Sequence, residues 1–320
     1  MSVPSKILIF ILCGAGAVLL IPQIKSGISG EGQAGARELS AAAPAQTADT
    51  YPRRVYLFAQ TTLHTAANGR MTPSSAAIKE GLLTALESPV ESGDFTWLRV
   101  RDERTGSEGW VYEHLTSNEA VALDSKKELA IGQERVDRFY ALPHDYRPGD
   151  LVPLDMRYCR IRQIELRQET AEAFIALHTA AAREGIHLYG FSGYRSYDYQ
   201  RELYLNRIKI WEKHRQRFVA RPGHTEHQLG TTLDVVGRDT NFAAQNGFDT
   251  TSEAAWLRAE CYRYGFVLSY GKDNTVPTGY GYESWHIRYV GKENAVAWIR
   301  THLAPENPIY KKYIPAGKGS

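Results

Sequence analysis

The pattern of apolar and polar side chains divides the chain into two regions with different periodicities. Between residues 51 and 118, short apolar runs at 55–58, 82–86, 97–100 and 109–112 are separated by clusters of glycine, serine, asparagine and aspartate. Runs of this length bounded by turn-forming residues are typical of β-strands. We therefore predict a small all-β barrel in this region.

A helical period appears further along the chain. Phe174, Leu177, His178 and Ala181 recur at helical spacing over residues 170–183, and Gly185 follows at a C-cap position. This pattern predicts an amphipathic helix that ends at the glycine. Residues 187–191 then have the apolar and aromatic character of a strand.

Two further helices are indicated by their N-terminal caps. Ser196 can cap a helix through residue 208, and Thr250 with Glu253 has the spacing of a capping box for a helix through 264. Gly265 is placed to end the second of these. Because helices and strands do not alternate regularly, the pattern favours an α+β fold over a doubly wound sheet.

The first 25 residues have the features of an export signal. Lys6 precedes a long apolar stretch at 7–21, and such a cationic start with a hydrophobic segment is typical of a signal peptide or signal anchor. No small-residue cleavage motif follows directly, so we expect an uncleaved membrane anchor, with a cleaved signal peptide as the alternative. Leu12 argues against lipidation of Cys13, because lipoprotein signals place a small residue there.

These observations define the expected organisation of the chain. Residues 26–50 are rich in glycine, alanine, serine and glutamine and predict a flexible linker. The predicted order is a signal segment at 1–25, the linker at 26–50, an all-β domain at 51–118, a connector at 119–145, an α+β domain at 146–303 and a tail at 304–320.

Composition and charge exclude some classes of protein. Of the 320 residues, 43% are hydrophobic and 23% charged, and the formal net charge is +2. A chain of this kind is globular, and it lacks the strong positive field of a nucleic-acid-binding protein. We therefore expect no nucleic-acid partner.

The cysteines do not form a metal-binding pattern. Cys13, Cys159 and Cys261 lack the CxxC spacing of structural zinc or iron–sulfur sites. Cys261 falls at helical spacing with Leu257, as a small core residue does. Pairing of Cys159 with Cys261 in an oxidising envelope stays open. Any metal ion must then be held by histidine and carboxylate side chains.

His227 and Asp234 form the first half of a candidate metal site. Asp234 lies between the apolar residues Leu233 and Val235, so in a strand its carboxylate points away from the core. An aspartate in this position is either a surface residue or part of a cleft, and its spacing from His227 does not decide between them.

The second half lies near the C-terminus. The aromatic and β-branched run at 285–290 predicts a strand in which His286 and Arg288 share one face. Glu283 lies three residues before His286, so joint action requires a turn or bulge between them, and glycines just upstream supply flexible backbone. Otherwise Glu283 is a surface carboxylate and His286 a hydrogen-bonded partner.

Together these residues suggest a catalytic metal ion. His227, Asp234 and His286 offer three nitrogen and oxygen ligands and leave a fourth position for water, as in catalytic zinc sites. Iron(II) uses similar ligand sets. Glu283 is then the candidate base that takes a proton from the water and delivers it to the leaving amine. The predicted reaction is peptide hydrolysis.

Four motifs in this region resemble the VanY-type D-alanyl-D-alanine carboxypeptidases of zinc peptidase family M15 in order and spacing. They are SGYRS at 192–196 followed by Gln200, TEHQLGTTLD at 225–234, GF at 265–266 and ESWH at 283–286. The resemblance covers about residues 146–303 and implies the α+β fold of hedgehog-like peptidases. Thr225 replaces the usual serine of the second motif, and Thr232 replaces a frequent alanine.

The resemblance also implies roles for individual residues. It makes His227, Asp234 and His286 the ligands of Zn²⁺ and Glu283 the catalytic base. It makes Arg195 the cation that stabilises the scissile carbonyl oxygen as it becomes an oxyanion. The implied substrate contacts are Arg195, Gln200, Ser192 and Trp285. His224 matches no ligand position and is interpreted as a neighbour.

The expected function is that of a D,D-carboxypeptidase that removes the C-terminal D-alanine from peptidoglycan stem peptides. The protein is expected to act as a monomer in the cell envelope, periplasmic or extracytoplasmic, with a membrane tether at its N-terminal segment. The alternatives are an L,D-carboxypeptidase acting on tetrapeptide stems and a non-catalytic peptidoglycan-binding protein.

The all-β region has a resemblance of its own. Trp97 and Val100, followed by Gly109, Trp110 and Val111, resemble the C-terminal part of bacterial SH3 domains, which commonly bind cell-wall polymers. The arginine-containing stretch usual in their first strand is not present at 62–65. A purely structural spacer is therefore the alternative to a wall-binding module.

Overall fold

The structure of the protein is a computed structural model. It describes residues 50–67, 70–93, 95–118, 131–132, 134–210, 219–238, 247–272, 278–303 and 307–314. The predicted signal segment at 1–25 lies outside these residues, as does all of the predicted linker except Thr50. No helix in the described ranges combines the length and the apolar character needed to cross a bilayer.

The N-terminal part is an antiparallel sheet, as the short apolar runs predict. Within the described residues it has eight strands in the order β3-β2-β7-β6-β4-β1-β8, with β5 paired to β6. Alternate residues such as Val55 and Leu57 are buried because successive side chains of a strand point to opposite faces. The strands are β1 (Arg53–Leu57), β2 (Thr61–Ala67), β3 (Arg70–Ile78), β4 (Gly81–Ala85), β5 (Val90–Ser92), β6 (Phe95–Asp102), β7 (Ser107–Tyr112) and β8 (Thr116–Asn118).

The sequence pattern found the most apolar of these strands and missed those rich in small or polar residues. β2 and β3 consist largely of threonine, alanine and serine, so their apolar alternation is weak. A 3₁₀ turn, η1 (Glu113–Leu115), connects β7 to β8. The sheet-rich character is confirmed, whereas assignment to a bacterial SH3 domain stays a prediction.

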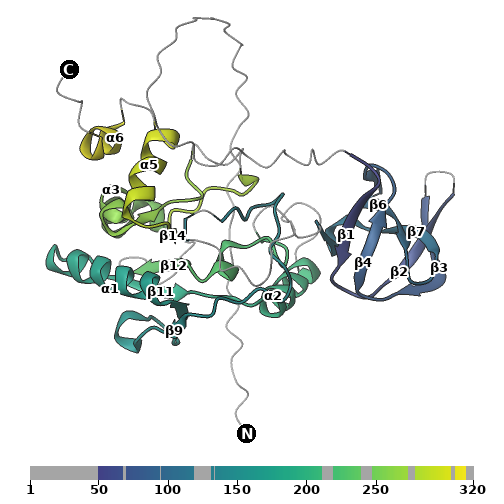
Figure 1. Cartoon of the computed structure of the whole chain (residues 1–320), viewed down its shortest axis with the longest axis horizontal. Helices are drawn as coiled ribbons and strands as arrows, with labels where there is room; N and C mark the ends of the chain where they lie inside the picture. Colours follow the sequence, from purple (N-terminus) through teal and green to yellow (C-terminus); the bar gives the residue numbers. More distant parts are fainter. Residues whose placement is uncertain are drawn as a thin grey trace, which may run out of the picture. The chain divides into compact units, whose positions relative to one another are not determined.

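The C-terminal part combines helices with an antiparallel sheet, which confirms the predicted α+β class (Figure 1). In the described part of the chain, this sheet has the order β11-β12-β14-β13, and β9 pairs with β10 in a separate ribbon. The strands are β9 (Leu151–Pro153), β10 (Glu165–Arg167), β11 (Leu188–Ser192), β12 (Thr232–Gly237), β13 (Phe266–Val267) and β14 (His286–Tyr289). The helices are α1 (Gln168–Arg183), α2 (Tyr197–Ile210), α3 (Ser252–Glu260), α5 (Lys292–His302) and α6 (Pro308–Tyr313), with 3₁₀ turns η2 (Met156–Tyr158), η3 (Glu226–Leu229), η4 (Phe248–Thr250) and η5 (Cys261–Tyr264).

One hydrophobic core joins α1, α3, α5 and the four-stranded sheet. Phe174 and Leu177 of α1 are fully buried against Leu233 and Val235 of β12, together with residues of α3, β14 and α5. The predicted amphipathic helix and its glycine end are confirmed, since Gly185 has a φ of 77° that favours glycine. Cys261 is a core residue, and Cys159 and Cys261 are both buried free thiols.

The predicted cap of the third helix is wrong by one residue. Thr251 caps α3, because its hydroxyl accepts a hydrogen bond from the backbone N–H of Ala254 at 3.1 Å. The Thr250 hydroxyl instead donates to the carbonyl of Gly247 within the preceding turn. With Thr251 as the N-cap, the third helical position is Ala254, so Glu253 is not placed to complete a capping box. Its carboxylate accepts from the N–H of Arg238.

Parts of the predicted connector and of the predicted tail are packed into the fold. In the predicted connector, Val136 and Leu142 are buried in a small cluster with Leu229, and Glu134 is 6% exposed. In the predicted tail, the short helix α6 is held by Tyr313, whose hydroxyl donates to the carbonyl of Ala259 at 2.8 Å. The few apolar residues of these two segments show no periodicity. Their burial depends on residues far away in the sequence, so a local pattern could not predict it.

Candidate metal centre and active site

Two neighbouring strands place the aspartate and one histidine of the predicted site side by side. Asp234 of β12 is paired with His286 of β14 in the antiparallel register. Side chains directly opposite one another on antiparallel strands project from the same face of the sheet. Leu233 and Val235, on either side of Asp234, are buried in the hydrophobic core. The alternation predicted for this strand is therefore confirmed.

His227 reaches the same face from the 3₁₀ turn η3, which immediately precedes β12. Thr225 caps this turn by accepting a hydrogen bond from the backbone N–H of His227. Gly230 ends the turn with a φ of 71°, a conformation that favours glycine and redirects the chain into the strand. Nδ1 of His227 lies 2.8 Å from the carbonyl of Gly193. Since a carbonyl only accepts, Nδ1 carries the hydrogen and Nε2 presents its lone pair.

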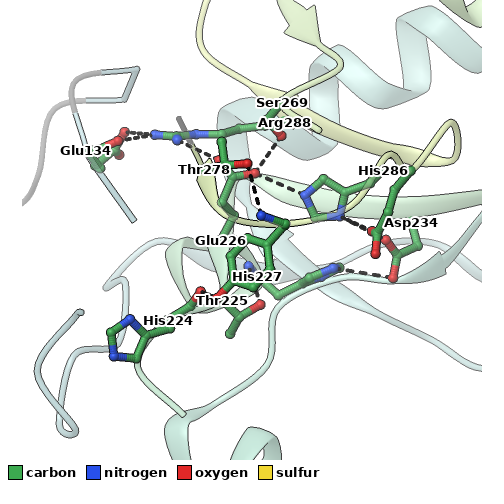
Figure 2. Close-up of polar contacts among 12 residues, drawn as sticks. Glu134, His224, Thr225, Glu226, His227, Asp234, Ser269, Thr278, His286 and Arg288 are labelled. Atoms are coloured by element: carbon green, nitrogen blue, oxygen red, sulfur yellow. Dashed lines mark hydrogen bonds and ion pairs between the residues drawn. The ribbon is translucent and has the colours of Figure 1, made fainter. Parts of the chain in front are cut away.

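The three predicted ligands meet at one point (Figure 2). One ligand atom from each of His227, Asp234 and His286 lies within 4.8 Å of the other two. Nε2 of His227 is 3.3 Å from Oδ2 of Asp234, and Nδ1 of His286 is 3.1 Å from Oδ1 of the same carboxylate. All three side chains are buried. This donor set could hold a metal ion.

The surroundings give His227 and Asp234 the ionisation states that metal binding requires. Burial, reinforced by the nearby Arg195 guanidinium, lowers the pKa of His227 to about 4, so its imidazole is neutral. Burial alone would raise the pKa of Asp234, but its contacts with His227, His286 and Arg195 outweigh it and hold this pKa well below its usual range. A neutral imidazole and an ionised carboxylate are the ligand forms of these groups. Burial alone would lower the pKa of His286, but its hydrogen bonds with Asp234 and Glu226 outweigh it and raise this pKa to about 10, so this imidazole must lose a proton to bind a metal ion.

Glu283 lies beside this cluster, across the turn that the sequence requires. Ser284 and Trp285 form a turn before β14, so the side chains of Glu283 and His286 come together despite their odd spacing. Oε2 of Glu283 lies 3.6 Å from Nδ1 of His286, and its side chain is 25% exposed. Burial raises the pKa of this carboxyl to about 7. A carboxyl group in this range can both accept and return a proton near neutral pH.

Arg195 extends the cluster on the side of Asp234. Its Nη2 donates to Oδ2 of Asp234 at 3.1 Å, its Nη1 to Oε1 of Gln200 at 2.9 Å and its Nε to the hydroxyl of Ser192 at 3.1 Å. The amide nitrogen of Gln200 in turn donates to the carbonyl of Ala220. Gln200 is fully buried, so the structure gives it a role in holding Arg195. Its direct contact with a substrate stays a prediction.

A pocket of about 250 Å³ opens onto these residues. Its walls contain every residue predicted for the site, and Trp285 is half-buried in them. Arg162 and Arg207 line the same pocket with exposed side chains. The described residues that line it include Arg195, Gln200, Ser192, Asp234, His227, His286, Glu283 and Trp285.

The sequence did not identify the residues behind the cluster. Glu226 is buried and its Oε2 lies 3.0 Å from Nε2 of His286. Tyr270 stacks on the same imidazole, with ring centroids 4.3 Å apart. Glu226 directly precedes the predicted ligand His227, and Arg288 shares a strand face with the predicted ligand His286. The sequence therefore contained a signal for both residues. Tyr270 had no such signal.

His224 points away from the cluster, as Figure 2 shows. Its Nδ1 lies 2.9 Å from the carbonyl of Asp137, and burial lowers its pKa to about 4. We expect His224→Ala to keep one zinc ion per chain, because the side chain of His224 points away from the ligand atoms. Metal content of the purified variant, measured by atomic emission, tests this. Loss of zinc from a folded variant would make His224 a ligand.

The fold and the cluster define a candidate mononuclear metal centre with an adjacent carboxylate base, at one face of an antiparallel sheet. Residues 163–292 match the family model of VanY, D-alanyl-D-alanine carboxypeptidase. These residues therefore form a VanY-family domain, which confirms the resemblance found in the motifs.

Known proteins share sequence with this chain over about half of its length. It is 38% identical to the "Putative carboxypeptidase YodJ" of Bacillus subtilis (strain 168), over 50% of this chain and 60% of that protein. It is 33% identical to a "D-alanyl-D-alanine carboxypeptidase" of Enterococcus faecium, over 48% and 46%. A solved structure of the LdcB LD-carboxypeptidase has 35% identity and a TM-score of 0.49, covering 56% of this chain and 83% of that one. The chain spans about half the length of the curated relatives.

Proposed function

We propose that this protein is a zinc-dependent D,D-carboxypeptidase that removes the C-terminal D-alanine from peptidoglycan stem peptides. The observation that carries the proposal is the convergence of His227, Asp234 and His286 on one point. The carboxylate of Glu283 stands next to that point. All four residues belong to the VanY-family domain.

The residues present fit a zinc ion. Two imidazoles and one carboxylate leave a position open for water, which is the arrangement of catalytic zinc. Nε2 of His227 is buried and makes no hydrogen bond within the described structure, as suits a nitrogen whose lone pair faces a cation. When bound, zinc lowers the pKa of a water molecule toward about 7 and polarises a carbonyl group.

Glu283 and Arg195 perform the proton and charge steps of the proposed reaction. Glu283 accepts a proton from the attacking water and returns it to the nitrogen of the leaving amino acid, as a general base and then a general acid. Arg195 donates hydrogen bonds to the scissile carbonyl oxygen as negative charge develops on it. Its guanidinium is held in position by Ser192 and Gln200.

The substrate class is inferred from the family and from the relatives. The family description and the name of the Enterococcus faecium relative both specify D-alanyl-D-alanine. The exposed arginines that line the pocket, Arg162 and Arg207, suit a peptide that carries free carboxylates. The motifs do not separate D,D- from L,D-carboxypeptidases, so that choice needs an experiment.

We expect the purified full chain to release one alanine from muropeptide pentapeptides and to leave tetrapeptides intact. Mass spectrometry of the products after incubation measures this. A chelator should abolish the reaction and added zinc should restore it, because the attacking water depends on the ion. Cleavage confined to tetrapeptides would establish the L,D alternative. Metal-independent binding to cell walls without any product would establish the non-catalytic alternative.

The proposed substrate places the protein outside the cytoplasm. Peptidoglycan stem peptides are exposed in the extracytoplasmic part of the envelope, and the apolar stretch at 7–21 is suited to export. The membrane tether and the monomeric state stay predictions.

A further inference from the structure

Behind His286 lies a row of buried side chains of alternating charge (Figure 2). Oε2 of Glu226 is 3.0 Å from Nε2 of His286. Nη1 of Arg288 donates to Oε1 of Glu226 at 2.9 Å, and its Nη2 donates to Oε2 of Glu134 at 3.1 Å. Glu226, Arg288 and Glu134 are all less than 9% exposed.

Glu226 is fixed by donors on both of its oxygens. The hydroxyl of Ser269 donates to Oε2 at 2.6 Å, and Arg288 donates to Oε1. Because a carboxylate only accepts, the hydrogen between Glu226 and His286 is on Nε2 of the imidazole. Nδ1 faces the Asp234 carboxylate and is the nitrogen that would bind the ion once its own hydrogen is lost. Glu226 therefore holds the ring in the orientation that directs Nδ1 toward the cluster.

Glu134 fixes the other end of Arg288. Nη2 of Arg288 also donates to the backbone carbonyl of Glu134 at 2.6 Å. The Glu134 carboxylate itself accepts from the N–H of Gly132 at 2.8 Å. Glu134 comes before the VanY match at 163–292, in the segment that the sequence pattern assigned to a connector. That segment thus contributes a buried charge behind the metal centre.

We propose that Glu226 is a positioning residue for the metal ligand His286 and that Glu134 anchors it through Arg288. The inference rests on the proposed function, because it assumes that the cluster binds zinc. Carboxylates that accept from the outer nitrogen of a ligating histidine orient the ring, and their loss typically lowers metal affinity about 10–100-fold. Arg288 needs both carboxylates, since a buried guanidinium with an unpaired side is strongly disfavoured.

The test is the zinc affinity of Glu226→Gln, measured on the full chain by competition with a chromophoric chelator. We expect a loss of roughly 10–100-fold. The glutamine amide keeps the shape of the carboxylate but lacks its charge. Glu226→Asp keeps the charge with a shorter reach, so we expect an intermediate loss. In the cobalt(II)-substituted Glu226→Gln protein, the visible absorption bands should shift, because the ring of His286 is no longer held.

Glu253→Gln is the matched control. Glu253 is a buried carboxylate of the same domain, and it accepts from the backbone N–H of Arg238 away from the metal cluster. We expect this control to alter thermal stability without altering zinc affinity. Glu134→Gln should lower zinc affinity by less than Glu226→Gln does, because it acts through Arg288.

The outcomes separate this inference from the proposed function. Wild-type protein that binds no zinc would contradict the proposed function. Wild-type zinc affinity and an unchanged cobalt spectrum in folded Glu226→Gln would overturn the positioning role. Equal losses of affinity in Glu226→Gln and Glu253→Gln would overturn it as well, because they would reflect general destabilisation. Unchanged affinity in Glu134→Gln would remove Glu134 from the anchor.

Discussion

Glu283→Gln is expected to retain zinc and to lose turnover by roughly 10²–10⁴-fold, the range that general acid–base catalysis contributes. The Glu283 carboxylate lies 3.6 Å from Nδ1 of His286 and 25% of its side chain is exposed to the pocket, so it can reach a water bound at the cluster. Glutamine has nearly the same shape but cannot accept the proton of that water. The measurement is kcat for release of D-alanine from a pentapeptide, with zinc content determined on the same sample.

The matched control for this variant is Glu202→Gln. Glu202 is an exposed carboxylate on α2, so its neutralisation removes a charge without touching the cluster. We expect its kcat to equal that of the wild type. Normal hydrolysis by Glu283→Gln would show that another group acts as the base, and loss of zinc from that variant would show that Glu283 is a ligand.

Asp234→Asn is expected to lose zinc, and with it all measurable hydrolysis. The Asp234 carboxylate is the shared neighbour of His227, His286 and Arg195, and it is the only anionic member of the predicted ligand set. Removal of a direct ligand should weaken binding by more than the roughly 10–100-fold typical of outer residues. Asparagine preserves the volume of the side chain, so the effect is one of charge and donor strength.

Zinc retained after dialysis against a graded chelator series measures this prediction. The wild type and His224→Ala should hold the ion at chelator concentrations that strip Asp234→Asn. Circular dichroism on each apoprotein shows whether the fold survives the substitution. A folded Asp234→Asn protein that holds zinc as tightly as the wild type would remove Asp234 from the ligand set.

Local patterns predicted much of the secondary structure. The helix expected over 170–183 is α1, Gln168–Arg183, and its apolar positions are those buried in the core. The helix predicted to start after Ser196 is α2, and the Ser196 hydroxyl accepts from the N–H of Tyr199. Such elements are predictable because the spacing of apolar residues and the capping side chain both act within a few residues.

Other features could not be predicted from the sequence, for equally physical reasons. Thr250 and Thr251 are both competent caps, but the Thr250 hydroxyl is used within the turn that Gly247 begins, and Thr251 caps α3. The connector at 119–145 has little apolar periodicity, yet Glu134 is buried against Arg288, 154 positions away. Contacts of this sequence separation leave no trace in a local pattern.

The sequence by itself determined which side chains could hold a metal ion and which face of each strand they occupy. It also determined that Glu283 needs a turn to reach His286, since the offset of three residues is incompatible with one straight strand. Only the tertiary structure decided that β12 and β14 pair with Asp234 opposite His286. It also decided that Glu226, Arg288 and Glu134 line up behind the imidazole. The physical reason is that strand register and the pairing of buried charges are set by the whole core, whereas periodicity reports only on each element alone.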